Sequence, residues 1–240
     1  MSLIKTILAV LYTIFALVGY LIIGLPAYLL GFLGLKRPMS RVIHWLAHIW
    51  GKGIIALSGS SVEVIGKEYI PKSGNVCFVS NHSGVVDILV AVAYINRPFG
   101  FIAKKELSYI PLLNIWILIL GGLFIDRKNI RKALKTINNG IKRIETGGAM
   151  LIFPEGTRSK GRGLLPFHTG SIKLATHSKA IIVPIAISGS YEVFEKNYRV
   201  NAVPIRVVFF PPIDTAQMSP EDRRHKLVDQ VRDIIASEIT

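Results

Sequence analysis

Residues 75–87 read NVCFVSNHSGVVD, and this stretch decides the fold. Asn75–Val79 is a largely apolar run typical of a buried strand, and Lys72-Ser73-Gly74 before it predicts a turn. After a loop that carries His82, the apolar residues of 85–95 predict a helix. Strand, loop and helix in this order are the repeating unit of α/β proteins, in which loops after parallel strands tend to carry the active site.

The same alternation continues on both sides of this stretch. The clearest helix is 128–145, where apolar residues recur at three- and four-residue steps between many cations, and Ser219-Pro220 opens a last helix. We expect further strands at 62–65, 100–103, 149–153, 180–188 and 205–210, and a short helix and strand within 112–125. These elements predict one α/β domain over residues 61–240, built on a mixed, mostly parallel sheet flanked by helices.

The N-terminal region differs in composition, because no charged residue occurs between Thr6 and Leu35. A helix of this length exceeds the ~30 Å hydrocarbon core of a bilayer. Either one tilted or kinked helix spans the membrane, or residues 24–26 (Gly-Leu-Pro) break it into two pieces that enter one leaflet. An amphipathic helix of 41–57, capped by Ser40, follows. We therefore interpret residues 1–60 as a membrane anchor.

The charge balance indicates an anionic partner. The chain has 29 Lys and Arg against 15 Asp and Glu, a net charge of +14. Residues 101–163 alone hold twelve bases and four acids, so 12 − 4 = +8 lies in this central stretch. Such a surface attracts anionic lipid, phosphate or nucleic acid. The single cysteine, Cys77, excludes an intrachain disulfide, and no Cys/His cluster has metal-ligand spacing, so we expect no metal site.

The first candidate site is the His82 loop. Asp87 follows five residues later in the first turn of the expected helix, within reach of the imidazole. A carboxylate there would fix the tautomer of His82 and leave its other nitrogen free as a general base. The alternative is an ordinary structural hydrogen bond. Ser83 suggests a serine hydrolase only weakly, since no G-x-S-x-G elbow surrounds it.

Two later segments carry groups that suit an anion. Residues 122–127 (GLFIDR) place Arg127 at the end of an apolar strand, and residues 153–159 (FPEGTRS) do the same for Arg158. Gly156 lets a ligand approach the backbone closely, Arg158 can hold a phosphate with two parallel bonds, and Glu155 can accept from a hydroxyl or orient the arginine. Each segment alone also reads as an ordinary turn. Lys104 and Lys105 join such a site or stay solvated.

Taken together, the segments resemble one family. N-H-x-x-x-x-D at 81–87, G-x-x-x-I-D-R-like residues before 128, F-P-E-G-T-R-S at 153–159 and the apolar V-P-I strand at 183–185 occur in this order. The chain is similar to the glycerolipid acyltransferase family, in particular to the bacterial 1-acyl-sn-glycerol-3-phosphate acyltransferases. One departure is His168, where relatives often have lysine.

The resemblance implies an enzyme that moves a fatty acyl group to the sn-2 hydroxyl of lysophosphatidic acid. The implied donor is an acyl thioester, either of acyl-carrier protein or of coenzyme A (acyl-CoA). It implies His82 as the base with Asp87 as its partner, no acyl-enzyme, no cofactor, and a place on the cytoplasmic side of the inner membrane. It implies the acyl donor at residues 183–187. The implied acceptor-binding residues are Lys104, Lys105, Arg127, Glu155, Gly156, Thr157 and Arg158.

Other functions stay open at this point. The same segments would serve an acyltransferase acting on glycerol 3-phosphate or on a lyso-aminolipid. A non-catalytic protein that binds anionic membranes is a second alternative. Nucleic-acid binding has only the charge in its favour, since no recognition motif is present.

Overall fold

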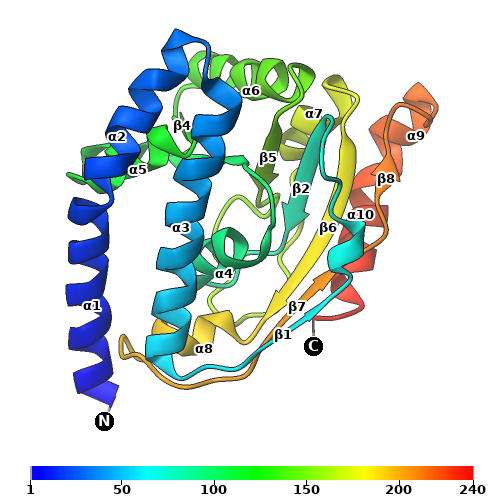
Figure 1. Ribbon diagram of the computed structural model, residues 1–240. Helices are drawn as coiled ribbons and strands as arrows, with labels where there is room; N and C mark the ends of the chain where they lie inside the picture. Colours follow the sequence, from blue (N-terminus) through cyan, green and yellow to red (C-terminus); the bar gives the residue numbers. More distant parts are fainter. Residues whose placement is uncertain (1, 240) are drawn as a thin grey trace.

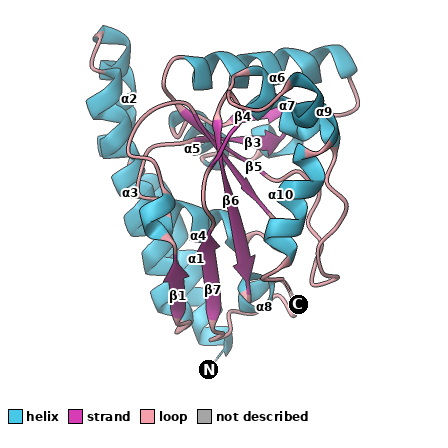
Figure 2. Ribbon diagram, turned by 90° about the vertical axis from the view of Figure 1, so that its right-hand side faces the viewer, coloured by secondary structure: helices cyan, strands magenta, loops and turns pink. Residues whose placement is uncertain are grey.

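The computed structural model describes residues 2–239, and its centre is an eight-stranded sheet (Figures 1 and 2). The strand order is β1-β7-β6-β2-β5-β3-β4, with β8 paired to the start of β6. β7 and β8 run antiparallel to β6, and the other neighbours are parallel, so the predicted mixed, mostly parallel sheet is confirmed. The strands are β1 (Val62–Ile65), β2 (Val76–Ser80), β3 (Gly100–Lys104), β4 (Leu123–Ile125), β5 (Ala149–Ile152), β6 (Ile181–Ser188), β7 (Ile205–Phe209) and β8 (Ile213–Asp214).

Helices cover both faces of this sheet, because its central strands are apolar on both sides. In β2, Val76 and Phe78 face one hydrophobic core, and Cys77 and Val79 face the other. The first core is covered by α3 (Lys36–Ser58), α4 (Val86–Tyr94), α5 (Leu113–Ile119) and α8 (Ser190–Phe194). The second is covered by α6 (Ile130–Glu145), α7 (Thr169–His177) and α10 (Leu227–Ala236), while α9 (Pro220–His225) precedes α10. The expected single C-terminal helix is thus divided at Lys226.

The N-terminal residues form a helical hairpin. In Figure 1, α1 (Ser2–Gly19) and α2 (Leu21–Leu30) run along one side, and α3 returns beside them. The stretch Ser2–Leu33 is the one helical segment of residues 2–239 that is long and apolar enough to cross a membrane, with a mean hydropathy of 2.4. Its apolar side chains are largely exposed, which indicates association with a membrane.

Two details of this hairpin differ from the sequence-based expectation. Of the two arrangements left open for the apolar run, the break at residues 24–26 is not found: Pro26 lies inside α2, and the interruption falls at Tyr20. Ser40 does not cap the next helix, since α3 begins at Lys36 and the Ser40 hydroxyl donates to the carbonyl of Arg37. The physical reason is that Pro38 lies in the first turn of α3, where a missing N–H costs no helical hydrogen bond.

α3 connects the hairpin to the sheet. Its residues Ile43, Leu46 and Ile55 are buried in the same core as Phe78 of β2. Lys5 of α1 donates to the carbonyl of Ser58 at 2.8 Å, which ties the start of the chain to the end of α3. The boundary at residue 60 between anchor and domain stays a prediction.

The parallel pairing brings the candidate segments together. Strands β6, β2, β5, β3 and β4 are neighbours that point the same way, so the loops after them meet at one edge of the sheet. This edge receives the loop with His82 after β2, the loop with Arg158 after β5 and the loop with Arg127 after β4. α8, which the sequence did not predict, follows β6 at the same edge.

The packing of α3 on α4 depends on Gly51. A Cβ at this position would lie 2.7 Å from the Leu89 carbonyl oxygen and 2.9 Å from Cγ2 of Val92. We expect Gly51→Ala to push the helices apart at a cost of roughly 1–3 kcal/mol, seen as a drop of several degrees in Tm of the detergent-solubilised protein. Gly170→Ala in α7, where a Cβ meets nothing within 4 Å, is the control. Equal melting of the two variants would contradict this packing.

Candidate active site

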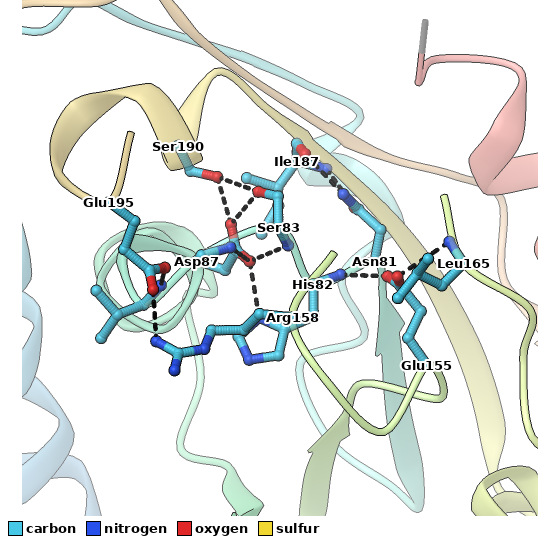
Figure 3. A network of polar contacts seen from close by, with 12 residues as sticks. Asn81, His82, Ser83, Asp87, Glu155, Arg158, Leu165, Ile187, Ser190 and Glu195 are labelled. Atoms are coloured by element: carbon cyan, nitrogen blue, oxygen red, sulfur yellow. Dashed lines mark hydrogen bonds and ion pairs between the residues drawn. The ribbon is translucent and has the colours of Figure 1, made fainter. Parts of the chain in front are cut away.

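His82 and Asp87 form the centre of the site (Figure 3). β2 ends at Ser80, the chain turns through a loop, and α4 begins at Val86, so Asp87 lies in its first turn. Nδ1 of the imidazole is 2.8 Å from Oδ2 of the carboxylate. The Asp87 side chain is fully buried and that of His82 is 17% exposed. Since Nδ1 faces the carboxylate, Nε2 is the nitrogen left to meet a substrate.

Asp87 accepts several further hydrogen bonds. The backbone N–H groups of Ser83 and Gly84 donate to Oδ2 at 2.7 and 2.9 Å. The hydroxyls of Ser83 and Ser190 donate to Oδ1. Hydrogen bonds of this number stabilise the ionised carboxylate despite its burial. The Ser83 hydroxyl contacts Asp87 and Ser190, so its position gives no support to a serine nucleophile activated by His82.

The rest of the His82 loop is fixed by its backbone and its ring. The His82 N–H donates to Oε1 of Glu155 at 2.6 Å, and its carbonyl accepts from the N–H of Ser159 at 2.7 Å. The imidazole stacks on the ring of Phe153, with centroids 4.1 Å apart and an angle of 20° between the planes. One residue earlier, Asn81 exchanges two 2.8 Å hydrogen bonds with the backbone of Ile187 in β6.

Glu155 braces this loop from the β5 side. Its second oxygen accepts from the N–H of Leu165 at 3.1 Å, and the side chain is buried. Burial raises the pKa of the Glu155 carboxyl above its usual 4.5, and the two backbone donors oppose this shift. In the structure Glu155 therefore contacts backbone amides and does not orient Arg158. Its contact with a substrate stays a prediction.

Arg158 is oriented by a residue that the sequence did not suggest. Its guanidinium donates to Oε1 of Glu195 at 2.6 Å, and Oε2 of Glu195 accepts from the N–H of Val85 at 2.6 Å. Figure 3 shows this carboxylate between the arginine and the start of α4. The arginine is 43% exposed, so a ligand at the surface can reach its remaining N–H groups.

Arg127, Gly156 and His168 meet beside this loop. Gly156 has a φ of +69°, and a Cβ there would lie 3.3 Å from Nη1 of Arg127 and 3.2 Å from Cδ2 of His168. The absent side chain thus leaves the backbone open between a cation and an imidazole. The segments 122–127 and 153–159, which carry Arg127 and Arg158, are therefore adjacent in space, although β3 lies between β4 and β5 in the sheet.

The other predicted binding residues lie farther along the edge or point to solvent. Lys105 donates to Asp126 at 2.9 Å, and Lys104 is 3.8 Å from Glu106. Thr157 is exposed in the loop between Gly156 and Arg158. Their roles in binding stay predictions. Residues 2–239 contain no group of three or more His, Cys, Asp or Glu side chains that could hold a metal ion.

An apolar cavity of about 180 Å³ lies next to the His82 loop. Its wall includes Val85, three residues after His82, and apolar side chains of α1, α3, α4 and α5. Representative lining residues are Leu17, Ala47, Ile88, Val92, Trp116 and Leu120. By contrast, residues 183–187, expected to serve an acyl donor, lie in β6 with Val183, Ile185 and Ile187 buried in the protein core.

Sequence reasoning missed Ser190, Glu195 and the stacking of Phe153 on His82. Ser190 and Glu195 lie more than a hundred residues after Asp87 and Val85, and no local pattern marks them. The one available signal was Gly189 at the end of β6, because a glycine after a strand next to β2 indicates a sharp turn at the same edge.

Comparisons with known proteins identify the family and support the fold. Residues 61–188 match the family model described as "Acyltransferase". A 1-acyl-sn-glycerol-3-phosphate acyltransferase of Borreliella burgdorferi is 33% identical over 184 residues, 76% of this chain and 73% of the relative. The Escherichia coli K12 protein of the same name is 32% identical over 193 residues, 80% of this chain and 78% of the relative. The crystal structure of the 1-acyl-sn-glycerophosphate (LPA) acyltransferase from Thermotoga maritima matches with a TM-score of 0.80 and 26% identity, covering 99% and 95% of the two chains.

The raised pKa of Glu155 predicts that the stability of the fold depends on pH. The folded protein binds this proton more tightly than the unfolded chain, so the carboxyl contributes stability that is complete below pH 4.5 and is lost as pH rises through the folded pKa. Glu155→Gln removes this slope. Its amide can accept from only one of the two backbone donors, so we expect a loss of about 1–3 kcal/mol. Denaturant unfolding at a series of pH values measures both the pH dependence of the unfolding free energy and its loss in the variant. The control is Glu106→Gln, at an exposed position. A pH slope that is unchanged in Glu155→Gln would contradict the assignment.

Proposed function

This chain belongs to the acyltransferase family, and we propose that it transfers a fatty acyl group from an acyl thioester to the sn-2 hydroxyl of 1-acyl-glycerol 3-phosphate, giving phosphatidic acid. The observation that carries the proposal is the contact between His82 and Asp87, in a loop that also lines an apolar cavity through Val85 and contacts Arg158 through Glu195. A base, an acyl site and a phosphate site are the three parts that this reaction requires.

The His82–Asp87 pair supports a general-base mechanism. Nε2 of His82 takes the proton of the acceptor hydroxyl while the oxygen of that hydroxyl attacks the thioester carbonyl carbon. Asp87 accepts from Nδ1–H and stabilises the imidazolium that forms. The carbon–sulfur bond then breaks, and the leaving thiolate takes the proton from His82. Because a thioester is already activated, this reaction needs neither a metal nor a redox cofactor.

Arg158 and Arg127 are the proposed ligands of the acceptor phosphate. Arginine binds phosphate with parallel hydrogen bonds, and both residues follow parallel strands at the same edge of the sheet, within the stretch 101–163 that has a net charge of +8. The open backbone at Gly156 and the exposed Thr157 add donors between them. Lys104 and Lys105 would raise the local potential without direct contact, because each already faces a carboxylate.

The apolar cavity is the proposed site of the acyl chain. Its lining is apolar and includes Val85, three residues after His82, so we propose that a chain seated there would have its thioester near His82. The exposed apolar surface of Ser2–Leu33 would hold this site at a membrane, where the lysolipid acceptor resides. We propose the cytoplasmic face, since acyl-carrier protein or acyl-CoA would supply the acyl group from the cytosol.

The decisive experiment compares wild type with His82→Ala. Purified protein is given radiolabelled lysophosphatidate and, as donor, either an acyl thioester of acyl-carrier protein or acyl-CoA. Glycerol 3-phosphate and a lyso-aminolipid are tested as rival acceptors. We expect the wild type to prefer lysophosphatidate and His82→Ala to lose about 10²–10⁴ in kcat, because the base is removed. Binding of lysophosphatidate should persist in the variant.

His177→Ala is the matched control, because His177 is exposed on α7 and bonds only to its own helix and neighbour. It should keep wild-type turnover. A near-normal kcat in His82→Ala would eliminate the base assignment. If the wild type prefers another acceptor, that acceptor replaces lysophosphatidate as the assigned substrate, and the proposed acyl-transfer chemistry is unaffected.

The acyl-chain site makes a separate prediction. Ala47 on α3 lines the cavity, so Ala47→Leu reduces its volume. We expect the preferred thioester to become shorter, measured as kcat/KM across a series of saturated acyl chains. Ala56→Leu, on the exposed side of the same helix, should leave the series unchanged. An identical chain-length profile for all three proteins would show that the acyl chain binds elsewhere.

A further inference from the structure

The short segment 190–195 touches both halves of the active site. Ser190 reaches Asp87, and Glu195 reaches Arg158 and the N–H of Val85 (Figure 3). We infer that two residues of this segment are additional functional parts of the enzyme: Ser190 positions the catalytic carboxylate, and Glu195 positions the phosphate-binding arginine. The inference rests on the proposed function, and it assigns roles to two residues outside the four sequence motifs.

Counting protons identifies Ser190 as the main donor to Oδ1 of Asp87. The Ser190 hydroxyl has one proton, and it points to Oδ1. The Ser83 hydroxyl is 2.8 Å from the Ser190 oxygen and 3.2 Å from Oδ1, so it makes the longer of the two hydroxyl contacts with Asp87. The two serine hydroxyls and Oδ1 therefore form one polar cluster. Ser190 is fully buried, so water does not replace its hydroxyl.

The backbone holds Ser190 in this place. Gly189 directly follows β6 and has a φ of +81°, a conformation that residues with a Cβ rarely adopt. A Cβ at Gly189 would also collide with the carbonyl of Pro204. The turn therefore directs the Ser190 hydroxyl from the end of β6 toward the start of α4. Asn81 fixes the same two strands through its bonds to Ile187.

Glu195 performs the corresponding task for Arg158. One carboxylate oxygen accepts from Nη1 of the arginine, and the other accepts from the N–H of Val85, the residue directly before α4. Only one of the five guanidinium N–H groups is needed for this pair, so Nη2 and Nε stay available to a phosphate. The Glu195 side chain is 9% exposed, which makes it a fixed support for an exposed arginine.

The two residues should affect different kinetic constants. Ser190 acts on the carboxylate that stabilises the imidazolium, a species formed during turnover, so its loss lowers kcat. Glu195 acts on a group that holds the acceptor before and during reaction, so its loss raises the acceptor KM. A residue needed only for folding would change neither constant selectively.

The first arm of the test is Ser190→Ala. We expect kcat to fall about tenfold, because a hydrogen bond to a charged group is lost, while the KM for lysophosphatidate stays within twofold. The control is Ser178→Ala, a buried serine whose hydroxyl bonds only to helix carbonyls. Its kcat should match the wild type, and the melting temperatures of both variants monitor folding.

The second arm is Glu195→Gln, which keeps an acceptor for Val85 and removes the charge that holds Arg158. We expect the KM for lysophosphatidate to rise about tenfold with kcat and the donor KM within twofold. Glu192→Gln on α8, whose carboxylate pairs with Lys196 at 3.0 Å away from the site, should behave as wild type.

Several results would overturn the inference. An unchanged kcat in Ser190→Ala would remove Ser190 from the machinery. An unchanged or lower acceptor KM in Glu195→Gln would show that this carboxylate does not position Arg158 for phosphate. If the wild type makes no product from any acyl thioester, the proposed function itself fails. This outcome depends on the wild type alone and is therefore distinguishable from a failure of the roles of Ser190 and Glu195.

Discussion

The buried charge of Asp87 is the constraint on which the site depends. A fully buried carboxylate is stable only when donors surround it, and here three come from the loop that precedes it: the His82 ring and the N–H groups of Ser83 and Gly84. Ser83 and Ser190 supply hydroxyls. The conformation of the loop, the first turn of α4 and the turn after β6 are therefore determined together. A change in any of them alters the orientation of the imidazole.

Much of this arrangement could be predicted because it depends on local order. A strand, a loop and a helix over residues 75–95 predict an α/β unit, and the five-residue spacing puts Asp87 in the first turn of the helix that follows the His82 loop. Parallel strands bring the loops with Arg127 and Arg158 to the same edge whatever the details of packing. Motif order along the chain was therefore sufficient to anticipate a shared site.

The features that could not be predicted depend on contacts between distant residues. Ser190 and Asp87 are 103 positions apart, and no periodicity marks a serine as a donor to a buried acid. The hydrogen bond that occupies Glu155 likewise comes from a backbone N–H 73 positions away, a group that every residue but proline carries. Pro26 and Ser40 misled for another reason, because their local preferences for breaking and capping helices were overridden by their place in α2 and α3.

Val85 shows why the polar and apolar parts of the site form one unit. Its N–H donates to Glu195, which holds Arg158, while the residue also lines the apolar cavity. The boundary between the proposed phosphate-binding and chain-binding surfaces thus falls within the loop that carries His82. An acyl thioester is apolar along its chain and reactive at its end, and the proposed acceptor is charged at its phosphate. In the proposed reaction both reactive atoms meet where these surfaces join, and this loop also carries Nε2 of His82, the nitrogen that is left free when Asp87 occupies Nδ1.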